Sequence, residues 1–368
     1  MRSWHSGKLF IAAAFMLALS SMHALAGPYL LFDVGSGRIL AEEDAFKRWY
    51  PASLTKLMTA YVAFQAVRNG EMQMNSPVRI SQNAAKEPPS KMGYKPGSVL
   101  TLDNALKIIM VKSANDIATA IAESVGGSEQ AFVVRMNAYA ERLGMTGTHY
   151  VNAHGLHSTG QYSTARDLAL LVRAIRTEFP AYAGYFSIEG VRDGEREFTN
   201  YNYLIGRFQG ADGMKTGYVC ASGFNLIATA TRGRRTLAAI VLGTHSQVER
   251  AERAAELLAQ GFQKRSFAAQ TLASLRPSSP DRHVATDMRP EICSAEAVAK
   301  RRGHRDEQGR LVFDSPLIRP MTREPQIVAV GLGGADGPES TAPRYADVPI
   351  PTPRPPYPGR QAVASEGD

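Results

Sequence analysis

Strand-forming sequence lies at both ends of residues 27–264, and helical sequence fills the stretch between them. Near the start, residues 28–34 and 38–43 are apolar runs on either side of Gly35-Ser36-Gly37, a spacing that predicts a β-hairpin. Three more strands are predicted near the end, at 214–218, 224–230 and 237–242. A strand must pair with other strands, so we expect the two ends to join in one antiparallel sheet.

The middle of this region has the periodicity of amphipathic helices. Apolar residues recur at spacings of three and four in a run of three helices across 103–143. Further helices are predicted at 53–68, at 163–175 and at 247–262. The predicted fold class is therefore α+β: an antiparallel sheet flanked by helices, with an inserted all-helical subdomain.

Residues 1–26 are expected to be a cleaved export signal. Arg2 and Lys8 give a basic start, Leu9 to Leu19 is a short apolar run, and Ala24-Leu25-Ala26 offers a cleavage site. An uncleaved anchor is the alternative, although the run is short for a bilayer. No other stretch is long and apolar enough to cross a membrane. We therefore expect an exported protein, periplasmic or extracytoplasmic, that is soluble after signal cleavage and has no stable membrane anchor.

Residues 265–368 are predicted to be a low-complexity tail rather than part of the 27–264 domain. Residues 277–368 hold 14 of the 21 prolines, with a dense cluster at Pro349–Pro358. Such a composition buries too little apolar surface to offset the cost of ordering, which indicates an extended or disordered tail. Its one apolar island, Ile327–Leu332, is either a short strand or a docking segment.

The basic charge of the chain does not indicate a nucleic-acid partner. The formal net charge is +8. However, no block of Lys and Arg with interleaved aromatic residues occurs, and nucleic-acid surfaces usually have one. An anionic cell-wall polymer would also suit a mildly basic surface.

Neither the cysteines nor the histidines predict a metal or disulfide framework. Cys220 and Cys293 are only two and lie far apart, so we expect two unpaired thiols, with Cys220 as a turn residue near the site. His149, His154 and His157 share one predicted loop, but their spacing fits no zinc pattern and no acidic residue lies between them. No metal and no cofactor are expected.

Serine and lysine residues supply the pattern that carries chemistry. Ser53 and Lys56 form the only Ser-x-x-Lys of the chain, and on a helix this spacing puts both side chains on one face. A serine hydroxyl is a weak nucleophile until a base takes its proton, and a lysine kept neutral by burial and a second cation can be that base. Lys215-Thr216-Gly217 lies far downstream and could supply the second cation.

Two Ser-x-Asn triplets could complete this pattern. Ser113-Ala-Asn115 joins two predicted helices and is preferred, whereas Ser81-Gln-Asn83 is expected to cap or turn a loop. Ser-x-x-Lys, Ser-x-Asn and Lys-Thr-Gly together are typical of penicillin-binding proteins and class A β-lactamases.

In the order of these motifs the chain resembles the low-molecular-mass penicillin-binding proteins, the serine D-alanyl-D-alanine carboxypeptidases. The resemblance covers residues 27–264. It rests on Tyr50-Pro-Ala-Ser-Leu-Thr-Lys-Leu-Met-Thr59, Ser113-Ala-Asn-Asp116, His154-Gly-Leu156, Tyr162-Ser-Thr-Ala-Arg-Asp167, Asp212-Gly-Met-Lys-Thr-Gly217 and Ser222-Gly-Phe-Asn-Leu226. It implies a β-lactamase/transpeptidase-like fold. The implied substrate is the D-Ala-D-Ala end of the peptidoglycan stem peptide, with β-lactam antibiotics as covalent inhibitors.

The resemblance also implies a role for each site residue. The catalytic residues are Ser53 as nucleophile, Lys56 as base and Ser113 as proton relay. The substrate-binding residues are Asn115, Lys215, Thr216, Gly217 and Tyr218. The backbone N–H groups of Ser53 and Tyr218 would hold the oxyanion.

Two positions leave open questions within this resemblance. Arg250 occupies a basic position that some relatives use near the substrate carboxylate, and a surface helix arginine is the equal alternative. His157 stands where the family commonly has an aspartate, which leaves deacylation open.

Three other functions compete. A class A β-lactamase needs a Glu-x-x-x-Asn element, and none lies between Asn115 and Lys215, so a penicilloyl adduct should be long-lived. A DD-endopeptidase would use the same machinery on wall cross-links and stays open. A non-catalytic wall-binding scaffold would be expected to lose Ser53 or a lysine, and this chain keeps them.

Overall fold

The computed structural model describes residues 27–264, 270–277 and 280–342. The predicted export signal and the proline cluster Pro349–Pro358 lie outside these residues. Within them, none of the helices has the length and apolar character that crossing a bilayer requires.

Both ends of the 27–264 region meet in one five-stranded antiparallel sheet, as predicted. Its order is β2-β1-β9-β8-β7. The strands are β1 (Tyr29–Asp33), β2 (Ile39–Glu43), β7 (Ala211–Val219), β8 (Gly223–Arg232) and β9 (Arg235–Thr244). β1 joins the two ends because it pairs with β9, with Tyr29 opposite Val241. β7 is therefore an edge strand, free on one side to face a ligand.

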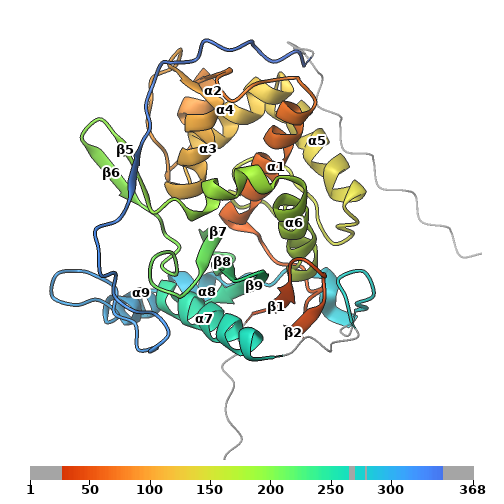
Figure 1. Ribbon diagram of the computed structural model, residues 1–368, viewed down its shortest axis with the longest axis vertical. Coiled ribbons are helices and arrows are strands. Elements are labelled where there is room, and N and C mark those ends of the chain that lie inside the picture. Colours follow the sequence, from red (N-terminus) through yellow and green to blue (C-terminus); the bar gives the residue numbers. More distant parts are fainter. Residues whose placement is uncertain (1–26, 265–269, 278–279, 343–368) are drawn as a thin grey trace, which may run out of the picture.

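Helices cover both faces of this sheet. α6 (Ala165–Glu178) packs on β1 and β9, whereas α7 (Gln247–Gln263) packs on β8 and β9 from the opposite side (Figure 1). Thr164 caps α6 and Ser246 caps α7, each through a side-chain oxygen that accepts a backbone N–H. The predicted flanking helices are thus confirmed.

The inserted helical part lies beyond α6, away from the sheet (Figure 1). It comprises α2 (Gln82–Lys86), α3 (Leu102–Val111), α4 (Asn115–Gly126) and α5 (Glu129–Arg142), with the strand pair β3 (Pro77–Arg79) and β4 (Val99–Thr101). α1 (Lys56–Arg68) runs through its centre and contacts α3, α4 and α5. Ser81 caps α2, which confirms the structural interpretation of the first Ser-x-Asn triplet. The α+β fold class is confirmed.

A small second sheet was not predicted. β5 (Gly190–Asp193) and β6 (Arg196–Thr199) form a hairpin after the 3-10 helix Pro180–Ser187. β10 (Ile327–Ala329) pairs with β5 in parallel, so the apolar island of the tail is a strand.

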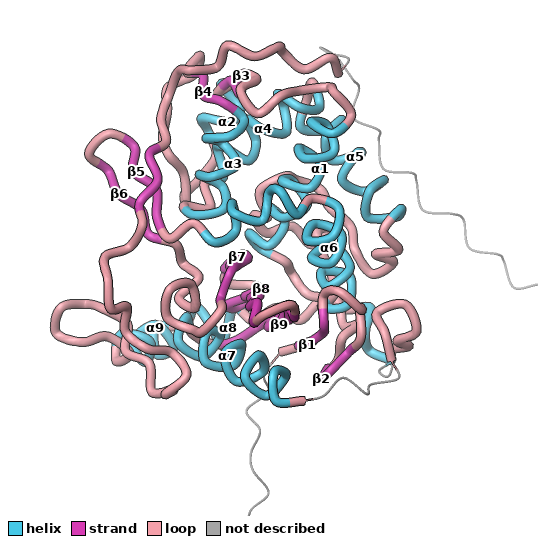
Figure 2. Tube along the Cα trace, viewed as in Figure 1, coloured by secondary structure: helices cyan, strands magenta, loops and turns pink. Residues whose placement is uncertain are grey.

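The described part of the tail lies against the domain. It contains the 3-10 helix Pro280–His283, α8 (Arg289–Cys293) and α9 (Ala295–Arg302), and the chain then runs mostly as loop alongside the helical part (Figure 2). Asn75 donates to Asp336 and Ser76 to the carbonyl of Pro338. Widely spaced apolar residues are buried on the domain: Leu272, Leu275, Met288, Ile292, Ile318 and Val330. Composition averages out such isolated anchors, which is why it indicated an extended or disordered tail and not these contacts.

The prediction of two unpaired thiols is wrong. Cys220 and Cys293 form a disulfide, with their Cα atoms 5.7 Å apart. The tail returns to the end of β7 and brings the two cysteines together. They are 73 residues apart in the sequence, and nothing in the sequence indicates that they are close in space.

Candidate active site

Ser53 and Lys56 lie one turn apart at the start of the central helix. Ala52–Thr55 forms a 3-10 turn that leads into α1, so the predicted helix begins with a tighter turn than expected. Ala52 takes a φ of 48°, a left-handed conformation. The turn brings Nζ of Lys56 to 3.1 Å from Oγ of Ser53, as the spacing predicts.

The amine of Lys56 is fully buried and held by two acceptors. Nζ lies 2.8 Å from Oδ1 of Asn115 and 2.6 Å from the carbonyl oxygen of His154. Burial, together with the nearby charge of Lys215, lowers the pKa of Lys56 well below its ordinary value. A neutral amine has two hydrogens and one lone pair. Asn115 and the carbonyl of His154 accept from Nζ, and Oγ of Ser53 is the third group in contact with the same nitrogen, at 3.1 Å.

The loop between α3 and α4 brings in the second serine. Ser113 sits at the junction with a φ of 61°, and its Oγ lies 3.1 Å from Nζ of Lys215. Asn115 is the first residue of α4, and its amide also donates to the carbonyl oxygen of Pro88 at 3.0 Å. Asn115 thus has its side chain fixed from both ends while it orients Lys56.

The edge strand β7 forms the opposite wall. Lys215 is 1% exposed, and burial together with Arg250 lowers its pKa to about 7. Gly217 passes so close to the nucleophile turn that a Cβ there would lie 3.2 Å from the backbone nitrogen of Ser53. A side chain at this position would push the strand from the turn, and glycine is the residue that fits. Tyr218 follows and is 42% exposed.

The structure gathers every predicted site residue in one place. A cleft of about 640 Å³ is lined by Ser53, Ser113, Asn115, Thr216, Gly217 and Tyr218, among others. Lys56 and Lys215 lie beneath it, each in contact with one of the two serines.

Arg250 belongs to this cleft and is not a surface residue. It is 3% exposed and lines the cleft. Its guanidinium donates to the carbonyl oxygens of Gly217, Asn225 and Tyr201, at 3.4, 3.4 and 3.2 Å. Packing thereby excludes the alternative of a surface helix arginine.

Sequence reasoning missed several supports of the site. Asn225 donates to the carbonyl oxygens of Tyr50 and Pro51 and accepts from the N–H of Gly243, so it ties two strands to the nucleophile turn. Arg301, from α9 in the tail, also lines the cleft. Asn225 lies in the motif Ser222-Gly-Phe-Asn-Leu226, but its distance in sequence from the other site residues did not indicate a role. Nothing in the sequence of α9 indicates that it lies near the cleft.

The three histidines of the 149–157 loop face different partners. His149 pairs with the carbonyl oxygen of Gly160, His154 lies 3.4 Å from a carboxylate oxygen of Glu87, and His157 packs edge-on against Tyr50. Within the described ranges, no three His, Cys, Asp or Glu side chains are grouped as metal ligands would be.

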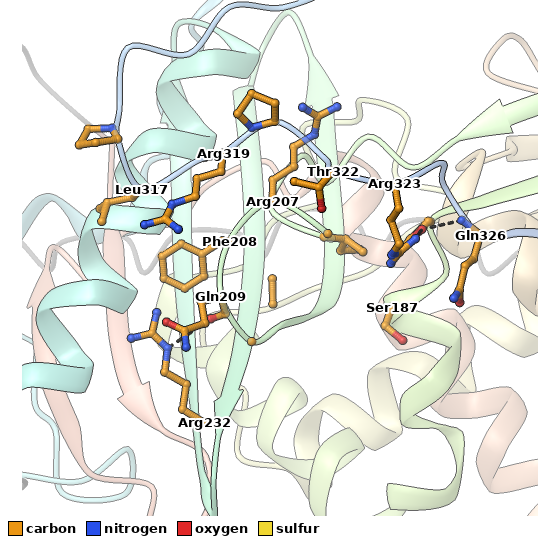
Figure 3. A pocket seen from close by; sticks show the side chains of 17 residues that line it. Ser187, Arg207, Phe208, Gln209, Arg232, Leu317, Arg319, Thr322, Arg323 and Gln326 are labelled. Carbon is orange, nitrogen blue, oxygen red and sulfur yellow. Dashed lines mark hydrogen bonds and ion pairs between the residues drawn. The ribbon is translucent and has the colours of Figure 1, made fainter.

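A second cavity of about 740 Å³ lies elsewhere, between the tail and the loop before β7. In the view of Figure 3, Arg319 and Arg232 lie at the left of this cavity, Arg323 at the right and Arg207 between them. There Arg323 pairs with Glu189 at 2.8 Å. This cavity shares no lining residue with the cleft and contains no lysine, so it lacks the groups for serine activation.

Comparison with known proteins identifies similar chains. The family model described as D-alanyl-D-alanine carboxypeptidase matches residues 17–246. The D-alanyl-D-alanine carboxypeptidase DacC of Escherichia coli is 36% identical over 258 residues, 68% of this chain and 64% of that protein. The chain thus spans less than two thirds of this relative's length.

Solved structures agree in fold. The crystal structure of penicillin binding protein 6B from Escherichia coli matches with a TM-score of 0.62 and 37% identity, over 65% of this chain and 77% of that one. Penicillin-Binding Protein D2 from Listeria monocytogenes, in a cefotaxime-bound form, matches with a TM-score of 0.59 and 30% identity, over 64% and 97%.

Proposed function

Because the chain belongs to the D-alanyl-D-alanine carboxypeptidase family, we propose that it is a serine DD-carboxypeptidase that removes the terminal D-alanine from peptidoglycan stem pentapeptides. The observation that carries this proposal is the position of the buried amine of Lys56. Its Nζ contacts Asn115, the carbonyl oxygen of His154 and Oγ of Ser53, so in its neutral form it can donate to the first two and accept the proton of Ser53 across 3.1 Å.

Acylation follows from this geometry. Ser53 attacks the carbonyl carbon of the penultimate D-alanine as Lys56 takes the hydroxyl proton. The backbone N–H groups of Ser53 and Tyr218 would stabilise the oxyanion, on the wall where Gly217 comes close to Ser53. The C–N bond then breaks, and the proton passes through Ser113 to the departing amine. Water hydrolyses the acyl-enzyme and releases the shortened peptide.

Cations at one end of the cleft would hold the substrate's carboxylate. Thr216 lines the cleft at 6% exposure, with Arg250 behind it and Lys215 beneath. A guanidinium and a hydroxyl are suitable donors for a terminal carboxylate. We therefore expect the substrate to have a free C-terminal carboxylate.

The disulfide supports an extracytoplasmic location. Bonds such as Cys220–Cys293 persist in oxidising compartments and are rare in the cytosol. Together with the predicted export signal, it supports action at the cell wall. A β-lactam, which resembles the D-Ala-D-Ala end, would acylate Ser53 and stay bound.

The test is intact-mass analysis with benzylpenicillin, combined with release of D-alanine from a pentapeptide. The wild type should gain one benzylpenicillin and release D-alanine, and Ser53→Ala should do neither. Ser187→Ala, in the second cavity, is the matched control and should behave as wild type. A wild type that forms the adduct but releases no D-alanine would be a penicillin-binding scaffold, and the carboxypeptidase proposal would fail.

A further inference from the structure

A residue of the tail lines the cleft. Arg301 lies in the last turn of α9 and lines the cleft together with Arg250 and Phe224. The guanidinium carbon of Arg301 is 5.4 Å from the ring centroid of Phe224, and that of Arg250 is 5.7 Å from the same centroid. Two cations therefore contact one aromatic ring in the wall of the cleft.

The charge of Arg301 is available to a ligand. Its side chain is partly exposed, and in the described part of the chain no carboxylate lies within ion-pair distance of it. By contrast, Arg253 and Arg289 each have an acidic partner. An unpaired guanidinium in a cleft, with an aromatic ring against it, is a suitable partner for an anion.

The disulfide places α9 beside the cleft. α9 has no buried residue of its own and is only eight residues long, so its packing alone would not hold it. α8 precedes it directly and is fixed by the Cys220–Cys293 bond, by the buried side chain of Ile292 and by the N–H of Met288, which donates to the carbonyl oxygen of Ala221 at 3.1 Å. Cys220 itself lines the cleft. The bond thus ties the helix that carries Arg301 to the end of β7.

The position is specific within α9. Lys300 and Arg302 flank Arg301 in sequence, but neither lines the cleft. Arg302 is exposed and borders a neighbouring hollow whose lining also includes Arg301 and Phe224. Of these three basic neighbours, Arg301 is the one that also lines the cleft.

We propose that Arg301 is a substrate-binding residue that selects a leaving group with a second carboxylate. The inference rests on the proposed function. Arg250 contacts the β7 backbone at Gly217 and would take the α-carboxylate of the departing D-amino acid. Arg301 lies against the same Phe224 ring but comes from the tail, so it can take a carboxylate on the side chain of that residue. Besides the peptides that end in D-alanine, the further substrate class is an acyl-D-alanyl peptide in which an acidic D-amino acid takes the place of the terminal D-alanine.

The experiment compares two substrates of equal size, diacetyl-L-lysyl-D-alanyl-D-glutamate and diacetyl-L-lysyl-D-alanyl-D-glutamine. They differ only in the charge of the terminal side chain. The wild type should have a higher kcat/KM for the glutamate peptide. Arg301→Gln should lower the glutamate-to-glutamine ratio about twofold to fivefold, the size of one partly screened ion pair. Arg302→Gln removes the same charge from the same helix and should leave the ratio unchanged.

The ratio also has a salt dependence that a structural role would not produce. In the wild type it should fall as ionic strength rises, and in Arg301→Gln it should be flat. Equal ratios in the wild type and Arg301→Gln, or a wild type without preference for glutamate, overturn the inference. Benzylpenicillin acylation is measured in the same samples. If the wild type is not acylated and cleaves neither peptide, the proposed function itself has failed; if it is acylated and the ratio does not move, only the role of Arg301 has failed.

Discussion

Replacing Lys215 by methionine should make the protein more stable and less active. Lys215 is fully buried in the β7 wall, and burial together with Arg250 lowers its pKa to about 7. In the unfolded chain the same side chain has an ordinary pKa near 10.5. A buried base with a lowered pKa opposes folding wherever the unfolded chain holds the proton more tightly.

The size of this effect follows from the two pKa values. The two pKa values differ by about 3.5 units, and each unit corresponds to about 1.4 kcal/mol. Folded Lys215 is already partly neutral at pH 7, which reduces the cost of folding to about 4 kcal/mol. Methionine has no charge and nearly the same volume, so it removes this cost. It also loses the contacts of Nζ with Ser113 and with the carbonyl oxygen of Thr216, about 1 kcal/mol each. The net gain at pH 7 is about 2 kcal/mol.

The pH dependence identifies the cause. Between pH 7 and pH 9 the unfolded lysine stays protonated while folded Lys215 loses its proton, so the unfolded state binds more protons and wild-type stability rises with pH. Lys215→Met lacks this rise, so its advantage should shrink by about 2 kcal/mol over that interval. Urea denaturation followed by circular dichroism at both pH values measures it. Acylation by benzylpenicillin should be roughly a hundredfold slower in the variant, because Ser113 and the carboxylate lose their cation.

An exposed lysine provides the control. Lys95→Met should differ from the wild type by the same amount at pH 7 and pH 9, because Lys95 is exposed. Two results would contradict this reasoning: Lys215→Met is less stable than the wild type at pH 7, or the difference in stability does not change with pH. Either result would mean that the pKa of Lys215 is not lowered in the folded protein.

Two further perturbations test the other supports of the site. Asn115→Asp keeps an oxygen acceptor at 2.8 Å from Nζ of Lys56 but adds a negative charge, so it should raise the pKa of Lys56. The pH profile of benzylpenicillin acylation should then move upward by about 1–3 pH units. A profile that does not move contradicts the role of Lys56 as a neutral base. The double variant Cys220→Ser/Cys293→Ser removes the cross-link between residues 73 apart, which should lower the free energy of unfolding in urea by about 2–4 kcal/mol. A reductant should lower the free energy of unfolding of the wild type to the same value and leave that of the variant unchanged. A variant as stable as the wild type would show that burial of Met288 and Ile292 alone holds the tail.

The fold class could be predicted because its signals are local. The apolar runs of β1 and β9, the helical period of α3 to α5 and the cap at Ser81 each depend on neighbours within a few residues. The β5–β6 hairpin escaped prediction because it is short and half exposed, so it has little apolar alternation.

In the site, too, local features could be predicted from the sequence, whereas features that depend on distant segments could not. The spacing of Ser53 and Lys56 determines their contact, because one helical turn brings positions three apart together. The motif order also gave the members of the cleft. Only the tertiary structure decided that Lys56 and Lys215 are buried, and so have lowered pKa values, since burial depends on segments from the whole chain. The same holds for the burial of Arg250, the disulfide and the arrival of Arg301. Contacts between residues far apart in sequence have no periodic signal, and they form only when the whole chain packs.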